Sequence, residues 1–238
     1  MGNFPPFTHV VPLGISCRVT YQVRVCFGSW KVYPFDWWIT PLAGLSRYLA
    51  APDVGRLYAS AALEEMVTDG EVSAIRSTAY GFQLFHEFPR RPGANKLATV
   101  APGWRDHIAA AAARHEERLR RLLRLDRAGN RILFVRHRFG GEAGVESGEE
   151  PGAAVAALWD ALRSRWRAAD IRLLLVNFGP IGSLPDGALR LDFEELPGPP
   201  REAWRGADDQ WKKNFSSLGL ALRPRPRIHL KRSPGPPD

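Results

Sequence analysis

The fold is decided by two nearly continuous apolar runs, Ile132-Leu-Phe-Val-Arg-His137 and Ile171-Arg-Leu-Leu-Leu-Val-Asn-Phe178. Both end in polar residues, as expected of strands that are covered on both faces of a mainly parallel sheet. Between them, apolar residues recur at helical spacing and form one stripe: Val155, Trp159, Leu162 and Trp166. A strand, a helix and a strand in this order indicate an α/β fold.

The flanking sequence extends this pattern. Short apolar stretches predict two further strands, Val10–Leu13 and Ala188–Phe193. Helices are expected over these ranges: Leu45–Leu49, Ala59–Met66, Trp104–Leu125 and Trp204–Phe215. His115 would lie on the solvated face of the third of these helices. We therefore predict a three-layer α/β fold, with a mainly parallel sheet flanked by helices, of a Rossmann-like or SGNH-like class.

The length and charge of the chain limit its possible domain organisation and partners. The 238 residues suffice for one substantial core. We expect a single catalytic-type α/β domain over residues 1–216 and a disordered, basic, proline-rich tail over residues 217–238. The net charge is +8, but residues 223–238 hold five Lys or Arg against one Asp, which leaves the body only mildly basic. This distribution argues against a nucleic-acid partner.

The chain has two cysteines, Cys17 and Cys26, which are too close in sequence to make a disulfide framework. A reducing compartment follows from that. With neither a signal peptide nor an apolar stretch of about 18 residues, we expect a cytoplasmic protein with no membrane partner. The sequence contains no dinucleotide-binding, P-loop or His-Glu-x-x-His pattern, so it predicts no cofactor and no metal site.

The segment Gly14-Ile15-Ser16-Cys17 places a thiol where an apolar strand ends and an amphipathic helix begins. The first turn of a helix has unpaired N–H groups and a partial positive charge, and both favour a thiolate over a thiol. Free cysteines are also among the most often buried residues, where they act as small hydrophobes. Cys17 is therefore a candidate nucleophile, with a buried structural thiol as the alternative.

Two other clusters contain polar groups among aromatic residues. In Tyr33-Pro-Phe-Asp36-Trp37-Trp38, four aromatic side chains surround one carboxylate. An unpaired carboxylate there would be costly, so Asp36 is expected either to be a structural clamp that accepts backbone hydrogen bonds, which we favour, or to point into a cleft. In Phe85-His86-Glu87-Phe88, strand alternation would point His86 and Phe88 to one face and Glu87 to the other.

Taken in order, these motifs resemble a known family over about residues 8–216. The segments that carry the resemblance are Leu13-Gly-Ile-Ser-Cys17, Gln22-Val-Arg24, Pro34-Phe-Asp-Trp37, Thr78-Ala-Tyr80, Phe85-His-Glu-Phe88, Ile132-Leu-Phe-Val-Arg136, Leu174-Leu-Val-Asn177 and Asp208-Asp-Gln-Trp211. They are similar to the bacterial DUF1796 family, which is labelled as papain-like cysteine peptidases. That family more often has His-Asp-Phe where this chain has His86-Glu87-Phe88.

The resemblance implies a cysteine-dependent hydrolase or acyltransferase with Cys17 as nucleophile and His86 as its base. In papain-like enzymes an Asn or Asp follows in the chain to orient the histidine, and Asn177 or Asp208 would supply it. The label also implies a papain-like α+β fold as the alternative to the parallel sheet. The remaining site candidates would bind a peptide, an acyl group or an anionic small molecule: Gly14, Ser16, Arg24, Asp36, Trp37, Arg136 and His137.

Two other functions stay open. The carboxyl ends of the parallel strands could bind an anionic ligand such as a sugar phosphate or a nucleotide sugar. Backbone donors of Gly14–Cys17 and the charges of Arg24, Arg136 and Arg138 would then hold the ligand. Alternatively, the chain is an interaction protein that recruits a partner through its basic tail.

Overall fold

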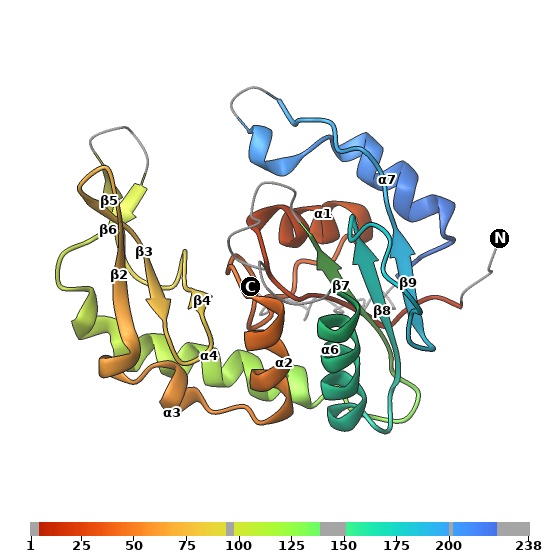
Figure 1. Ribbon diagram of the computed structural model, residues 1–238, viewed down its shortest axis with the longest axis horizontal. Coiled ribbons are helices and arrows are strands. Elements are labelled where there is room, and N and C mark those ends of the chain that lie inside the picture. Colours follow the sequence, from red (N-terminus) through yellow and green to blue (C-terminus); the bar gives the residue numbers. More distant parts are fainter. Residues whose placement is uncertain (1–4, 94–97, 139–150, 200–201, 223–238) are drawn as a thin grey trace, which may run out of the picture.

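A four-stranded parallel sheet forms the centre of the protein (Figure 1). The computed structural model describes residues 5–93, 98–138, 151–199 and 202–222. The strands follow the order β1 (His9–Pro12), β7 (Arg131–His137), β8 (Asp170–Val176) and β9 (Ala188–Leu191), and all three pairings are parallel. The four strands predicted from the apolar runs are thus confirmed, each to within two residues at its ends.

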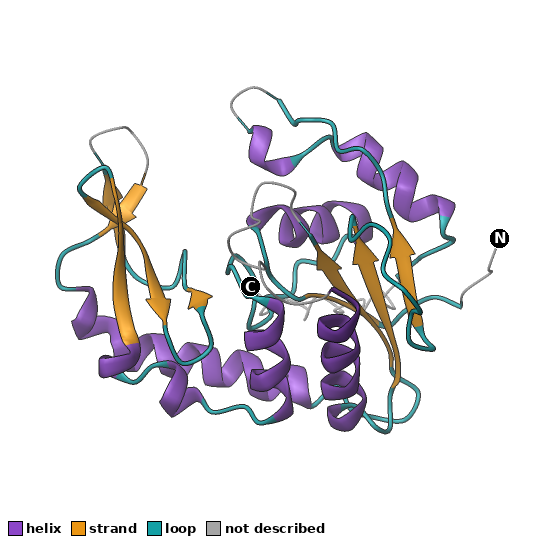
Figure 2. Ribbon diagram, viewed as in Figure 1, coloured by secondary structure: helices purple, strands orange, loops and turns teal. Residues whose placement is uncertain are grey.

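Helices cover both faces of this sheet, as Figure 2 shows. On one face lie α1 (Cys17–Phe27) and α7 (Asp208–Ser217), and on the other lie α2 (Leu42–Ala50) and α6 (Pro151–Arg165). Successive residues of β7 alternate between these two cores: Phe134 packs with α6, and Val135 packs with α1. The predicted stripe of α6 is confirmed, since Trp159 contributes to the core there.

A second, smaller group of elements is inserted between α2 and β7, which we call the insertion (residues 54–107). It comprises α3 (Val54–Leu57), a 3₁₀ turn (Ser60–Ala62), β2 (Leu63–Thr68), β3 (Glu71–Ser77), β4 (Phe82–Gln83), β5 (Arg90–Pro92), β6 (Ala98–Val100) and a further 3₁₀ turn (Trp104–His107). β2, β3 and β4 pair antiparallel, as do β5 and β6. A papain-like fold would have a largely antiparallel central sheet, whereas antiparallel ladders among the described strands are confined to the insertion.

The insertion corrects one prediction. Residues Ala59–Met66 were expected to be helical, but they form a 3₁₀ turn and most of β2. The hairpin is closed by Asp69 and Gly70, whose φ angles of 53° and 77° suit a tight turn between antiparallel strands. Asp-Gly is a strong hairpin signal, and it outweighs the helical spacing of the few apolar residues before it.

The third predicted helix begins with the 3₁₀ turn Trp104–His107 and continues as α4 (Ile108–Leu123). His115 was expected on its surface, but it is fully buried. Its ring stacks on Trp38 at a centroid distance of 4.8 Å, and its Nε2 lies 2.8 Å from the hydroxyl of Tyr48. Burial lowers its pKa to about 3, so it is a neutral core residue.

The folded part of the chain extends beyond residue 216, where the domain boundary was predicted. After α7, Leu220 packs into the core between the sheet and α1, and the N–H of Phe7 donates to the carbonyl of Ala221 at 2.8 Å. Leu222 forms a parallel bridge with Phe7. The rest of the predicted tail, residues 223–238, lies outside the described residues.

Candidate functional site

The turn between β1 and α1 has an unusual backbone. Gly14 and Ile15 both have positive φ angles, 79° and 80°. The left-handed region is unfavourable for a β-branched residue such as Ile15, whose side chain is buried in the protein. Ser16 precedes the helix with no side-chain capping bond, and its buried Oγ has no hydrogen-bond partner among the residues that the structure describes. Backbone strain of this kind persists where surrounding structure enforces it, and it is concentrated at functional sites.

Thr40 and Arg136 enforce that turn. The Thr40 hydroxyl donates to the carbonyl of Leu13 at 2.8 Å and accepts from Nη1 of Arg136 at 2.8 Å. The Arg136 guanidinium also donates to the carbonyls of Leu13 and Thr40. Gly14 is required beside them, because a Cβ there would lie 2.4 Å from the Thr40 hydroxyl. Arg136 was expected to bind substrate, but it is fully buried and holds the turn instead.

The turn presents Cys17 to His86. Cys17 is the first residue of α1, and its Sγ lies 3.7 Å from Nε2 of His86. The two residues are 69 positions apart in sequence, so only the tertiary fold brings them together. This distance is within the range of a hydrogen bond to sulfur, and catalytic contacts between a thiol and an imidazole are often this long before substrate binds.

His86 lies in a turn of the insertion between β4 and β5, which corrects the predicted strand alternation. Glu87 and Phe88 are both buried, whereas His86 is exposed. The Glu87 carboxylate accepts hydrogen bonds from Arg114 at 3.0 Å and from Arg118 at 3.2 Å, both on α4. Arg114 also donates to the Glu87 carbonyl at 2.8 Å. Glu87 therefore anchors the turn to α4 and does not contact the imidazole of His86.

Arg90 supplies positive charge beside this pair. Its guanidinium donates to the carbonyl of Phe85 at 2.6 Å and to that of Ser73 at 3.1 Å, which fixes it next to the His86 turn. Burial lowers the pKa of Arg90, and the nearby Cys17 raises it, as expected for a cation close to a group that becomes negative. Burial and the charge of Arg90 together lower the pKa of His86 below 6.5. The lowered pKa favours the neutral imidazole, which can accept a proton.

Asp36 and Trp37 border the pair on another side. The Asp36 carboxylate accepts from the backbone N–H of Tyr33 at 3.1 Å and from Arg24 at 2.7 Å, the bonding expected of a structural clamp. Burial still raises the pKa of Asp36 to about 6. The clamp holds Trp37 in a left-handed conformation, with φ 67°, and its ring packs edge to face against His86 at 6.1 Å. Trp37 therefore lies at the candidate site, whereas Arg24 and Asp36 hold the segment around Trp37 in place.

The two candidates for orienting His86 lie elsewhere. Asp208 accepts hydrogen bonds from Gln22 at 2.9 Å and from the Tyr21 hydroxyl at 3.2 Å, where α7 meets α1. The side-chain amide of Asn177 donates to Glu195 at 2.8 Å. Asn177 directly follows β8 and Asp208 is the first residue of α7, but neither contacts His86. Among the described residues, the only hydrogen-bond contact of the imidazole is the one with Cys17.

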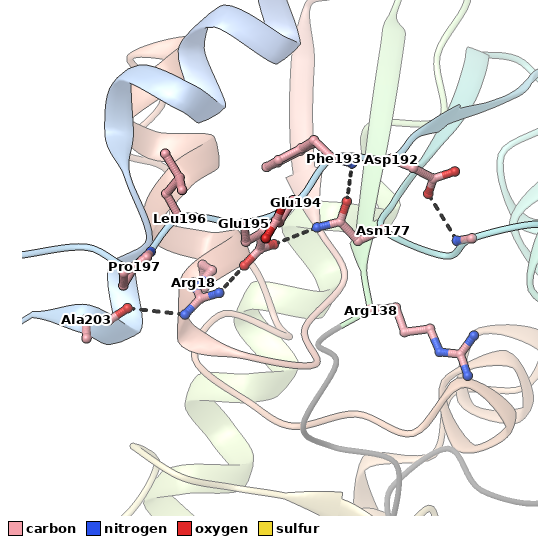
Figure 3. A pocket seen from close by; sticks show the side chains of 11 residues that line it. Arg18, Arg138, Asn177, Asp192, Phe193, Glu194, Glu195, Leu196, Pro197 and Ala203 are labelled. Atoms are coloured by element: carbon pink, nitrogen blue, oxygen red, sulfur yellow. Dashed lines mark hydrogen bonds and ion pairs between the residues drawn. The ribbon is translucent and has the colours of Figure 1, made fainter.

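Glu195 was missed from the sequence, although its carboxylate contacts three polar side chains at the strand ends, of which Figure 3 shows Arg18 and Asn177. Its carboxylate bonds to Arg18, to His137 and to Asn177. His137, expected to bind substrate, is fully buried and is held by this contact. Glu195 belongs to the polar run that follows β9, so the rule that polar residues gather at the carboxyl ends of parallel strands could have pointed to it.

A cavity of about 850 Å³ opens at the same strand ends. Arg18, Asn177 and Glu195 line it, together with Arg138, whose guanidinium lies 3.4 Å from the carbonyl of Phe178. No cluster of three potential metal ligands occurs within the described part of the chain. Nor does any helix within that part have the length and apolar character needed to cross a membrane.

Comparisons with family models, with curated proteins and with solved structures found no match. The resemblance to the DUF1796 family therefore stays a prediction. The geometry of Cys17, His86 and Arg90 is the basis on which a function is inferred.

Proposed function

We propose that this protein is a cysteine-dependent hydrolase or acyltransferase in which Cys17 is the nucleophile and His86 the general base. The observation that carries the proposal is the 3.7 Å contact between Sγ of Cys17 and Nε2 of His86. Support comes from the strained turn that presents the thiol and from Arg90, whose charge favours a thiolate there. The resemblance to DUF1796 points to the same pair of residues.

The chemistry proceeds in two stages. Neutral His86 takes the proton from the Cys17 thiol, and the thiolate attacks an acyl carbon, whose carbonyl oxygen becomes an oxyanion. Collapse of this intermediate breaks the bond to the leaving group, which takes the proton back from the imidazolium. Water, or an acceptor nucleophile, then gives its proton to His86 and attacks the thioester, which releases Cys17. N–H groups in the first turn of α1 would stabilise the oxyanion.

The proposal also covers the substrate, the fold class and the cell compartment. A peptide or another acyl compound is the proposed substrate. Four parallel strands, with the nucleophile directly after the first, fit a Rossmann-like or SGNH-like hydrolase sheet. Neither Cys17 nor Cys26 forms a disulfide with another described residue, which fits a reducing cytoplasm.

Alkylation by iodoacetamide tests the nucleophile, because Cys26 offers a matched thiol on the same helix. Burial raises the pKa of Cys26 to about 12, so it should react slowly at neutral pH. We expect Cys17 to react at pH 6 at least about tenfold faster than a free peptide thiol. His86→Ala should slow the reaction, and Cys26→Ser should not. If Cys17 reacts no faster than Cys26, or shows the pH profile of an ordinary thiol, the proposal is wrong.

A second candidate is a binding module for a small anionic ligand at the strand-end cavity. The observation that favours it is Arg138, whose charge lines the cavity with no ion-pair partner among the described residues. Cys17→Ser separates the two functions. A hydrolase would lose nearly all turnover, whereas an anion-binding module would keep its affinity for inorganic phosphate and lose it only in Arg138→Gln.

A further inference from the structure

Three aromatic side chains continue outward from His86 and form what we call the aromatic strip: Trp37, Trp204 and Tyr21. The ring of Trp37 lies 6.1 Å from that of His86 and 6.1 Å from that of Trp204. Trp204 in turn lies 5.6 Å from Tyr21. Each contact is edge to face, so the rings form a continuous aromatic surface that starts at the candidate dyad.

The strip is not needed to hold its own segment in place. Trp204 belongs to η3 (Ala203–Arg205), which is fastened by backbone carbonyls. Arg18 donates to the carbonyls of Trp204 at 2.9 Å and Ala203 at 3.2 Å, and Gln22 donates to that of Arg205 at 2.7 Å. The indole of Trp204 remains 43% exposed. A single exposed indole is common on protein surfaces. An exposed indole that continues an aromatic surface from the candidate dyad indicates a binding site.

The two arginines that lie over the strip are each paired with a carboxylate. Arg24 lies over the ring of Trp37 at 5.2 Å, and its guanidinium is paired with Asp36 at 2.7 Å. Arg205 lies over the rings of Tyr21 and Trp204, and it is paired with Glu202 at 2.5 Å. A ligand on the strip would therefore meet π surfaces and neutralised cations. These surroundings favour a planar, uncharged group over a charged one.

We propose that the aromatic strip is the subsite for the substrate group attached to the carbon that Cys17 attacks, and that this group is planar and uncharged, such as an aryl or a conjugated acyl group. The inference rests on the proposed function, since it places the reacting carbon at Cys17. The strained φ of 67° at Trp37 supports it, because this conformation sets the indole between the dyad and Trp204. The strip thus selects the substrate by its shape.

Two alkylating reagents of similar size test the inference: iodoacetanilide, with a planar ring, and N-cyclohexyliodoacetamide, with a saturated one. The ratio of their second-order rate constants at Cys17, divided by the same ratio for N-acetylcysteine, measures selectivity for a planar group. We expect a ratio of about 5 in the wild type. Trp204→Ala should bring it close to 1, and Trp204→Phe should retain part of it.

Trp30→Ala is the matched control, because Trp30 is 68% exposed and makes no contact with the strip among the ring pairs described. It should leave the ratio unchanged. A wild-type ratio near 1, or an unchanged ratio in Trp204→Ala with a native circular dichroism spectrum, would overturn the inference. The same Cys17 thiolate attacks both reagents, so the ratio of rate constants does not depend on the fraction of thiolate. A slow Cys17 with a high ratio would refute the proposed function alone.

Discussion

Thr40→Val removes the hydroxyl that connects the Cys17 turn to the buried Arg136 and leaves the side-chain volume almost unchanged. Two bonds are lost: the 2.8 Å bond to the Leu13 carbonyl and the 2.8 Å bond from Arg136. Leu13 keeps its contact with Arg136 at 3.0 Å, so its carbonyl stays satisfied. The guanidinium keeps its bonds to two carbonyls but loses one acceptor while fully buried.

The expected loss of stability follows from the hydrogen bonds that Thr40→Val removes. A neutral hydrogen bond contributes about 1 kcal/mol, and a buried charged donor that loses an acceptor costs about 1–3 kcal/mol. Allowing for the contacts that remain, the free energy of unfolding should fall by about 2 kcal/mol. For a chain of this length the melting temperature should then fall by about 4–8 °C. Urea unfolding followed by tryptophan fluorescence measures the first quantity, and calorimetry measures the second.

Thr78→Val is the control, because Thr78 is exposed and its hydroxyl makes one bond, to the Ala62 carbonyl at 3.2 Å. It should change stability by less than about 0.5 kcal/mol. Thr40→Val should also slow alkylation of Cys17, since the turn that presents the thiol loosens, and Thr78→Val should not. Equal stability of the two variants would show that the Thr40 hydroxyl does not hold the turn.

Three further predictions concern charge and backbone. Arg90→Gln should raise the NMR titration midpoint of His86 from its value below 6.5, because a nearby cation is removed, whereas Arg91→Gln, an exposed arginine paired with Glu71, should leave it unchanged. The pKa of Asp36 is about 6 in the folded protein and 3.8 in the unfolded chain, so the wild type should lose up to about 3 kcal/mol of stability as the pH rises from about 4 to 6. Asp36→Asn cannot titrate and should abolish this loss. Gly14→Ala should destabilise the fold by at least about 2 kcal/mol, measured by urea unfolding, because its φ is 79° and a Cβ would lie 2.4 Å from the Thr40 hydroxyl. A stable variant would contradict the close packing against Thr40.

The central sheet could be predicted because its physical signal is local. Strands covered on both faces are apolar at most positions, so β7 and β8 stand out without knowledge of their neighbours. The start of α1 was equally accessible, since strand and helix periodicities meet at Gly14–Cys17. Cys17 could therefore be placed at a strand-to-helix turn before its partners were known.

The insertion was harder because its strands are short and half exposed. In β2 only Leu63 is fully buried, so the alternation that identifies a strand is nearly absent. His115 was misplaced for a related reason: the arginines of α4 suggest a solvated helix, yet the aromatic core around Trp38 accepts a neutral imidazole. The polar run after β9 could have pointed to Glu195, but its partners come from three distant segments, which no local pattern specifies.

The two halves of the candidate dyad are held in different ways. Cys17 follows a turn that is locked from within the core by Thr40 and Arg136, both fully buried. His86 lies on an exposed turn of the insertion, fastened to α4 through Glu87. Buried hydrogen bonds resist displacement more than exposed ones. If substrate binding shortens the 3.7 Å contact, the movement is therefore expected mainly on the side of His86.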